Sequence, residues 1–164
     1  MGAIVELLMK LALTIFLVFS AATGLIADEI RGKVVSIADG DTITVLDADK
    51  HQHKIRLEGI DAPEKKQAFG TKSRQKLGDL VAGKDVTVQW TKKDRYSRIV
   101  GHVYLGDRDI DLEMVKAGMA WHYRQYSKST ELAAAEAEAR KNRVGLWVDT
   151  NPVPPWEFRK TKKK

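Results

Sequence analysis

Residues 56–64 read Arg-Leu-Glu-Gly-Ile-Asp-Ala-Pro-Glu, and residues 39–42 read Asp-Gly-Asp-Thr. Both stretches contain glycine and one contains proline, which are typical of chain reversals that place functional side chains on one rim of a domain. The side chains that would meet there are the carboxylates of Asp41, Asp61 and Glu64 and the guanidinium of Arg56. Oxygen ligands hold Ca²⁺ or Mg²⁺, a guanidinium binds phosphate, and a carboxylate that stays off the metal can accept a proton from water. This set suits phosphodiester chemistry.

The pattern around these stretches is that of a β-hairpin followed by a third strand. The predicted strands are residues 30–37, 42–46 and 51–60, with the Asp-Gly pair at 39–40 as the first turn. An isolated Asp-Gly pair is usually only a turn, but Asp41, matched by Asp61, is more than a hairpin requires. Strict alternation would place Asp61 on the face opposite Arg56. We therefore expect the third strand to end or bulge near Gly59.

Two further strands and three helices are expected after residue 64. The predicted strands are residues 85–90 and 99–105, and the predicted helices are residues 71–81, a short helix around residues 112–115 and an alanine-rich helix over residues 131–142. Asp109 or Asp111 would cap the short helix, and Thr130 the alanine-rich one. Five short strands with a helix after the third match an OB-type barrel, so the expected class is mainly β with α, or α+β.

A basic loop separates the last two predicted strands. Residues 92–98 read Lys-Lys-Asp-Arg-Tyr-Ser-Arg. Such a loop can be merely solvated. In a functional interpretation Arg98 contacts a phosphate, while Arg95 and Tyr96 contact the nucleic-acid backbone or stack on a base. Spacing alone leaves the two interpretations open.

Composition limits the chemistry further. The chain of 164 residues carries a net charge of +6 and has no cysteine. The positive charge favours an acidic partner such as nucleic acid or an anionic membrane. The lack of cysteine excludes disulfides, thiolate nucleophiles and cysteine-ligated zinc. His51 and His53 share one strand face, but with no further histidine nearby we expect them to be surface residues rather than zinc ligands.

The sequence resembles the thermonucleases, also called micrococcal or staphylococcal nuclease homologues. Three motifs carry the resemblance in the family's order and spacing: residues 39–42, residues 55–64, and residues 94–98 before an apolar strand. The resemblance extends from about Ile30 to Trp147. It implies a five-stranded OB-fold barrel with three helices, and an enzyme that hydrolyses the phosphodiester bonds of DNA and RNA. A barrel alone indicates only that nucleic acid is a suitable ligand, so catalysis has to be argued from the site.

The resemblance also implies a metal site. Asp41, Asp61 and the backbone carbonyl of Ala62 would hold Ca²⁺. Ala62 stands where the founding member of the family has threonine, so a backbone ligand survives but a hydroxyl contact does not. Glu64 would be the general base that deprotonates or positions the attacking water.

The remaining implied roles concern the substrate. Arg56 and Arg98 would neutralise the phosphate as negative charge develops on it. Cleavage would leave 3′-phosphates with little sequence preference. Tyr126 falls where the family has a nucleotide-contacting tyrosine, while His122 is expected to be structural.

The two ends of the chain differ from the middle. Residues 1–27, with an uncharged apolar run and a small-residue end, are predicted to be a signal peptide or, if uncleaved, a membrane anchor. Residues 28–148 would form the nuclease domain and residues 149–164 a proline-containing basic tail. The tail could bind DNA non-specifically or be a disordered end, and the sequence favours neither. A cleaved leader implies a secreted or periplasmic protein, which we expect to be a monomer with no protein partner.

Two other functions are compatible with this pattern. One is a non-catalytic OB module that only binds single-stranded nucleic acid. Its weakness is that such a relative would usually lack one or more of Asp41, Arg56, Glu64 and Arg98, and all of them are present. The other is a membrane-anchored protein whose basic surface contacts lipid headgroups, which requires an uncleaved leader.

Overall fold

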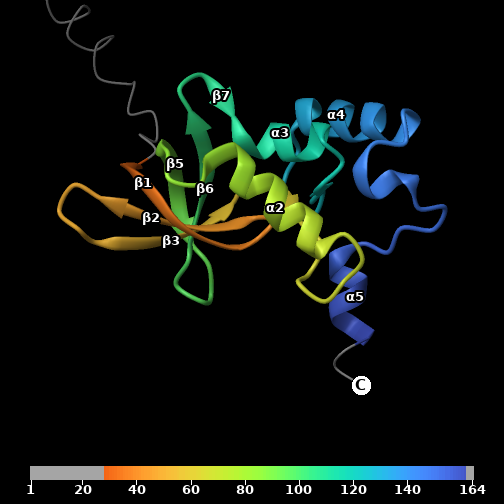
Figure 1. Cartoon of the computed structure of the whole chain (residues 1–164), viewed down its shortest axis with the longest axis horizontal. Coiled ribbons are helices and arrows are strands. Elements are labelled where there is room, and N and C mark those ends of the chain that lie inside the picture. Colours follow the sequence, from red (N-terminus) through yellow and green to blue (C-terminus); the bar gives the residue numbers. More distant parts are fainter. Residues whose placement is uncertain (1–27, 162–164) are drawn as a thin grey trace, which may run out of the picture.

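A computed structural model describes residues 28–161, and Figure 1 shows a strongly twisted β-barrel with helices packed along one side. The predicted leader therefore lies outside the described residues. Five long strands form the barrel: β1 (Asp28–Asp39), β2 (Thr42–Asp47), β3 (Gln52–Leu57), β5 (Asp85–Lys93) and β6 (Ile99–Leu105). No helix within residues 28–161 has the length and apolar character to cross a membrane.

The barrel closes through one parallel pair of strands. The sheet order is β3-β2-β1-β5-β6, extended by β7 (Arg108–Asp109), with antiparallel neighbours throughout. β3 then pairs with β6 in parallel, Ile55 opposite Ile99, so the two ends of the sheet meet. Closure removes the exposed edges that an open sheet would present. The mixed α+β class and the five-stranded OB-type barrel are confirmed.

Alternation along the strands fills the barrel interior with branched aliphatic side chains. The fully buried set includes Ile43, Val45, Ile55, Leu57, Val88 and Val103. In β3 the inward-facing Ile55 and Leu57 flank Arg56, which is left on the other face. A buried aliphatic side chain contributes about 1.5–3 kcal/mol, so this interior fixes the register that positions Arg56.

The third strand ends where the sequence predicts. β3 stops at Leu57, and Gly59 adopts a left-handed φ of 73° before the two-residue strand β4 (Ile60–Asp61). β4 pairs with β8 (Trp121–His122) rather than with the barrel. The reversal at Gly59, a conformation that costs glycine little, is what returns Asp61 to the side of Arg56.

Helices pack along one side of the barrel (Figure 1). They are α2 (Gly70–Val81), α3 (Ile110–Lys116) and α4 (Thr130–Lys141), followed by a 3₁₀ turn (Gly145–Val148) and α5 (Pro155–Thr161). The three helices expected within residues 28–148 are all present, and the described residues contain a fourth α-helix in addition. The fourth, α5, lies in the predicted tail and is marked at the lower end of the molecule in Figure 1.

Two helix caps distinguish between alternatives in the sequence. Asp109, not Asp111, caps α3, because its Oδ1 accepts a hydrogen bond from the Leu112 amide at 2.9 Å. Ser129 caps α4, accepting from the Leu132 amide at 3.1 Å, so the prediction of Thr130 is wrong by one residue. Serine and threonine are comparable caps, which is why adjacent candidates cannot be separated by type.

Close contact between the β1–β2 turn and α2 positions Asp41. A Cβ at Gly40 would lie 1.8 Å from Ser73 Oγ and 2.8 Å from the Cβ of Ala62. Rotating the Ser73 hydroxyl away from Gly40 would break a hydrogen bond, because this hydroxyl donates to the Met119 carbonyl at 2.6 Å. Only glycine fits between helix and turn at this point.

Replacing Gly40 with alanine should therefore destabilise the protein by about 1–3 kcal/mol, the usual cost of overpacking. Gly78 is the matched control, because it lies within α2 and a Cβ there meets nothing within 4 Å. Gly78→Ala should stabilise by up to about 1 kcal/mol through helix propensity. Urea unfolding of the two variants measures both effects, and changes of the same sign would contradict this account of the turn.

Candidate active site

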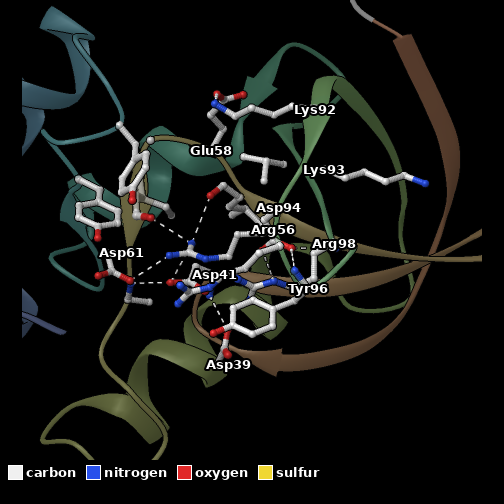
Figure 2. Close-up of a pocket in the computed structure, with 18 of the residues that line it drawn as sticks. Asp39, Asp41, Arg56, Glu58, Asp61, Lys92, Lys93, Asp94, Tyr96 and Arg98 are labelled. Carbon is white, nitrogen blue, oxygen red and sulfur yellow. Dashed lines mark hydrogen bonds and ion pairs between the residues drawn. The ribbon is translucent and has the colours of Figure 1, made fainter. Parts of the chain in front are cut away.

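A pocket of about 660 Å³ opens where the turns after β1 and β3 meet the β5–β6 loop. All nine residues singled out from the sequence line it: Asp41, Arg56, Asp61, Ala62, Glu64, Arg95, Tyr96, Arg98 and Tyr126. Figure 2 shows its charged groups, which come from segments well separated in the chain. The fold therefore brings the predicted site residues together, although their roles remain predictions.

Asp41 is a buried carboxylate at the start of β2. Its Oδ2 accepts from the Ala62 amide at 2.6 Å, and its Oδ1 from the Thr42 hydroxyl at 3.1 Å. Burial raises the pKa of Asp41 to about 7, although the Arg56 guanidinium acts in the opposite direction. Carboxylates at Asp39 and Asp61 raise the pKa of Asp41 further. A carboxylate in this position is stabilised by any cation that comes close to it.

Arg56 lies between the carboxylates of Asp41 and Asp61 and contacts both. Its Nη1 lies 3.0 Å from Asp41 Oδ2, and its Nη2 donates to Asp61 Oδ1 at 2.9 Å. Nη1 also donates to the Ile60 carbonyl at 3.0 Å. Figure 2 draws these contacts as dashed lines around the guanidinium. The side chain of Arg56 is only 13% exposed, so the pairing takes place in a largely desolvated position where it is strong.

Asp61 and Glu64 carry an interaction that the sequence analysis missed. Arg159, from α5, donates to Asp61 Oδ1 at 3.1 Å and Oδ2 at 2.8 Å, and to Glu64 Oε1 at 2.8 Å. The residues are 98 and 95 positions apart in sequence. From the sequence the tail is expected only to bind DNA or to be a disordered end, so a guanidinium within the carboxylate site is not predicted.

The β5–β6 loop holds Arg98 through Asp94. Asp94 accepts from the Arg98 Nε at 2.7 Å and from the backbone amides of Tyr96 and Arg98 at 2.8 and 3.0 Å. Burial alone would raise the pKa of Asp94, but these hydrogen bonds outweigh it and lower the pKa. The positive φ of Ser97, 61°, completes the tight turn. The loop is therefore ordered by hydrogen bonds that hold the Arg98 side chain, and it is more than a solvent-exposed connection.

Aromatic side chains lie on two sides of the pocket. Tyr96, 65% exposed, has the guanidiniums of Arg95 and Arg98 at 4.9 and 5.5 Å from its ring centre. Tyr126, 61% exposed, packs edge-to-face on Tyr123 at 4.7 Å. Large exposed aromatic faces beside a basic pocket are suited to stacking on bases. By contrast His122 is buried and contacts Ser127, in agreement with a structural role.

The chemistry of the donor set fits a hard divalent cation. The side chains of Asp41 and Asp61 are 7% and 1% exposed and converge on one guanidinium, which shows that this position favours positive charge. Three carboxylates with oxygen donors only are the kind of ligand that Ca²⁺ or Mg²⁺ takes. A second acidic group, Asp47 with Asp49 and His51, lies at the β2–β3 turn outside the pocket and is largely exposed.

His51 belongs to this group, and His53 lies two residues further on, in β3. His51 is exposed, and His53 contacts Asp47 through Nε2 at 2.7 Å. The hydrogen bond from His53, the largest influence, lowers the pKa of Asp47. Asp47 therefore has histidine partners within this cluster, while Asp49 and His51 are exposed.

Comparison with known proteins gives a consistent result. A family model described as staphylococcal nuclease homologue matches residues 54–149. An uncharacterized endonuclease of Escherichia coli is 49% identical over 135 residues, which cover 82% of this chain and 88% of that protein. One from Haemophilus influenzae is 44% identical over 158 residues, 96% and 87% of the two chains. A micrococcal nuclease of Shigella flexneri is 42% identical over 171 residues, 94% and 98% of the two.

Removing the guanidinium at residue 56 should destabilise the protein in a pH-dependent way. Arg56→Met leaves Asp41 buried without its cation, which raises the pKa of Asp41 further above its unfolded value of 3.8. The folded form then binds more protons than the unfolded chain, so stability falls as pH rises from about 4 through 7 and beyond. We expect a loss of about 3–5 kcal/mol at pH 8 and a smaller one at pH 5.

Arg31→Met provides the control for that measurement. Arg31 pairs with Glu29 on the surface, with side chains 76% and 39% exposed. Its loss should cost under about 1 kcal/mol. Denaturant unfolding at both pH values, with a chelator present, compares the variants. Equal losses, or a loss for Arg56→Met that does not grow with pH, would show that Arg56 does not neutralise Asp41.

Proposed function

The chain belongs to the staphylococcal nuclease homologue family, and on this basis we propose that it is a Ca²⁺-dependent nuclease that hydrolyses DNA and RNA. The observation that carries the proposal is the convergence of Asp41, Asp61 and Glu64 with Arg56 and Arg98 in one pocket. Hydrolysis of a phosphodiester needs charge neutralisation and a base, and this pocket contains groups suited to both. The names of the relatives, endonuclease and micrococcal nuclease, support the same class.

In this proposal three groups hold the metal. Asp41 and Asp61 would supply carboxylate oxygens and Ala62 its backbone carbonyl. When bound, Ca²⁺ supplies positive charge that polarises the scissile phosphate. The amide of Ala62 already donates to Asp41, so the two ligands are held in a fixed relation.

The protein side chains account for the remaining chemistry. Glu64, at the pocket rim with its side chain 36% exposed, is accessible to water and would accept its proton as the oxygen attacks phosphorus. Arg56 and Arg98 would stabilise the additional negative charge on the phosphate. The bond from phosphorus to the 5′ oxygen then breaks, a proton passes to that oxygen, and the phosphate stays on the 3′ end.

The surroundings of the pocket favour single strands or frayed duplex as the substrate. Tyr96 and Tyr126 present exposed rings, and every base has a face on which such rings can stack. Little sequence preference is expected, since stacking and phosphate contacts carry no base-specific information. From the predicted leader we further propose that the protein acts outside the cytoplasm, secreted or periplasmic.

The decisive experiment combines metal dependence with a single substitution. Residues 28–164, purified, should cut single-stranded DNA and RNA with Ca²⁺ and lose the activity in a chelator. Glu64→Gln, which keeps shape but not basicity, should reduce kcat by about 10²–10⁴-fold. Glu138→Gln, on the exposed face of α4, is the control and should leave kcat unchanged.

Each outcome of this assay has a distinct meaning. Binding of DNA without cutting under any divalent metal would favour the non-catalytic OB module. Cutting that resists the chelator would mean that Asp41 and Asp61 do not hold an essential metal. Full activity of Glu64→Gln would remove Glu64 from the role of base.

The planar guanidinium of Arg98 should contribute to catalysis beyond its positive charge. Arg98→Lys keeps the positive charge but loses the planar donors, one of which is fixed by Asp94. We expect kcat to fall by about 10²–10³-fold, the usual effect of losing one oxyanion donor. Arg108→Lys, paired with Glu113 on the surface, serves as the control and should have no effect. Similar kcat values for Arg98→Lys and the wild type would contradict the assignment.

A further inference from the structure

The C-terminal helix α5 brings a second guanidinium, besides that of Arg56, into the carboxylate site. Arg159 bonds both oxygens of Asp61 and one oxygen of Glu64, at 2.8–3.1 Å. Asp61 Oδ1 also accepts from Arg56 at 2.9 Å, so both carboxylate oxygens of Asp61 are already engaged by arginine. Arg159 therefore occupies the direction from which another cation would approach Asp61 and Glu64.

The position of Arg159 is fixed by the packing of its helix. Trp156, one turn earlier, stacks on Tyr123 with ring centres 5.3 Å apart and planes 2° apart, and meets Trp121 edge-to-face at 5.5 Å. The segment before the helix is also held, because Gln67 donates to the Val153 carbonyl at 2.6 Å. Residues three apart lie on the same helix face, so the anchoring of Trp156 aims Arg159 at the site.

The charges of the site place Arg159 in competition with a divalent ion. Asp41, Asp61 and Glu64 face the two guanidiniums of Arg56 and Arg159. A divalent cation that enters with Arg159 still in place meets an additional like charge within a few ångströms. Arg56 is largely buried and tied to backbone carbonyls, whereas the side chain of Arg159 is 41% exposed and is held by carboxylates. Of the two arginines, Arg159 is therefore the more easily displaced from the carboxylates.

We propose that Arg159 is a displaceable counter-cation of the candidate metal site, which sets the affinity of that site for a divalent ion through its contacts with Asp61. The ion binds Asp61 only when it displaces the guanidinium, so α5 weakens metal binding. The inference rests on the proposed function in one respect, namely that Asp41 and Asp61 hold a divalent cation.

Arg159 lies beyond the part of the chain that the family model matches. The family model ends at residue 149, ten positions before Arg159. The segment beyond it reads Asn-Pro-Val-Pro-Pro-Trp-Glu-Phe-Arg from residue 151 to residue 159. Prolines limit the conformations of the chain before α5, and a proline at the first position of the helix is well tolerated.

The test is the affinity of the full chain for Ca²⁺ alone, by isothermal titration calorimetry, in the wild type, Arg159→Gln and Lys160→Gln. Arg159→Gln should bind Ca²⁺ about tenfold more tightly, because it removes a like charge from the site. Lys160→Gln removes the same charge from the next residue of α5, which pairs with Glu157 outside the pocket. It should change the affinity by less than about twofold, as expected for a screened surface charge.

A second measurement follows Arg159 directly. In ¹⁵N-labelled wild type, the Nε–H resonance of Arg159 should move as Ca²⁺ is added and stop moving when the site is saturated. Binding of Ca²⁺ that leaves this resonance unchanged would overturn the inference.

The calorimetric outcomes separate the inference from the proposed function. If the wild type and Arg159→Gln both bind Ca²⁺, but Arg159→Gln binds it equally or more weakly, the inference is overturned and the proposed calcium site is not. If neither the wild type nor Arg159→Gln binds Ca²⁺, both the inference and the proposed calcium site are overturned.

Discussion

The ion pairs from Arg56 to Asp41 and Asp61 are the constraint on which the site depends. They join the start of β2 to the turn after β3, with both carboxylates nearly excluded from water. Burying unpaired charge costs several kcal/mol, so the turns are stable in this arrangement only because the guanidinium lies between them. The same arrangement creates a place where positive charge is favoured and negative oxygen ligands are fixed in advance of binding.

The barrel provides the rigidity that this arrangement needs. The barrel closes through the parallel β3–β6 pair, which sets Arg56 of β3 opposite Val100 of β6. β6 is the strand that directly follows the loop containing Arg98. Arg56 lies on β3, and Arg98 is the loop residue immediately before β6, so the two phosphate-binding candidates are positioned by neighbouring strands. Gly40 and Gly59 complete the geometry, the first by allowing close contact with α2 and the second by its positive φ.

The parts that could be predicted from the sequence are those encoded locally. Alternation of apolar residues gave the five long strands, and the Asp-Gly turn and Gly59 located the two reversals that carry Asp41 and Asp61. Arg95, Tyr96 and Arg98, singled out from one motif, all line the pocket, because Asp94 of the same motif shapes the loop. The cap of α4 was missed by one residue, since Ser129 and Thr130 are chemically equivalent candidates.

Arg159 could not be predicted because its partners are nearly a hundred residues away. The prolines and lysines of the tail are typical of an unstructured end, and they concealed a helix that begins at Pro155. One signal was present: Trp156 followed three residues later by Arg159 is an anchor and a charge on one helix face. Such a pattern indicates that the segment packs on something, but not on what.

The most direct test of the account is a crystal structure of the protein with Ca²⁺ and a non-cleavable single strand. The account predicts one ion bound by Asp41 and Asp61, with a backbone phosphate within hydrogen-bond distance of Arg56 and Arg98. An ion found instead at the exposed Asp47, Asp49 and His51 cluster, with the pocket holding neither ion nor phosphate, would contradict it.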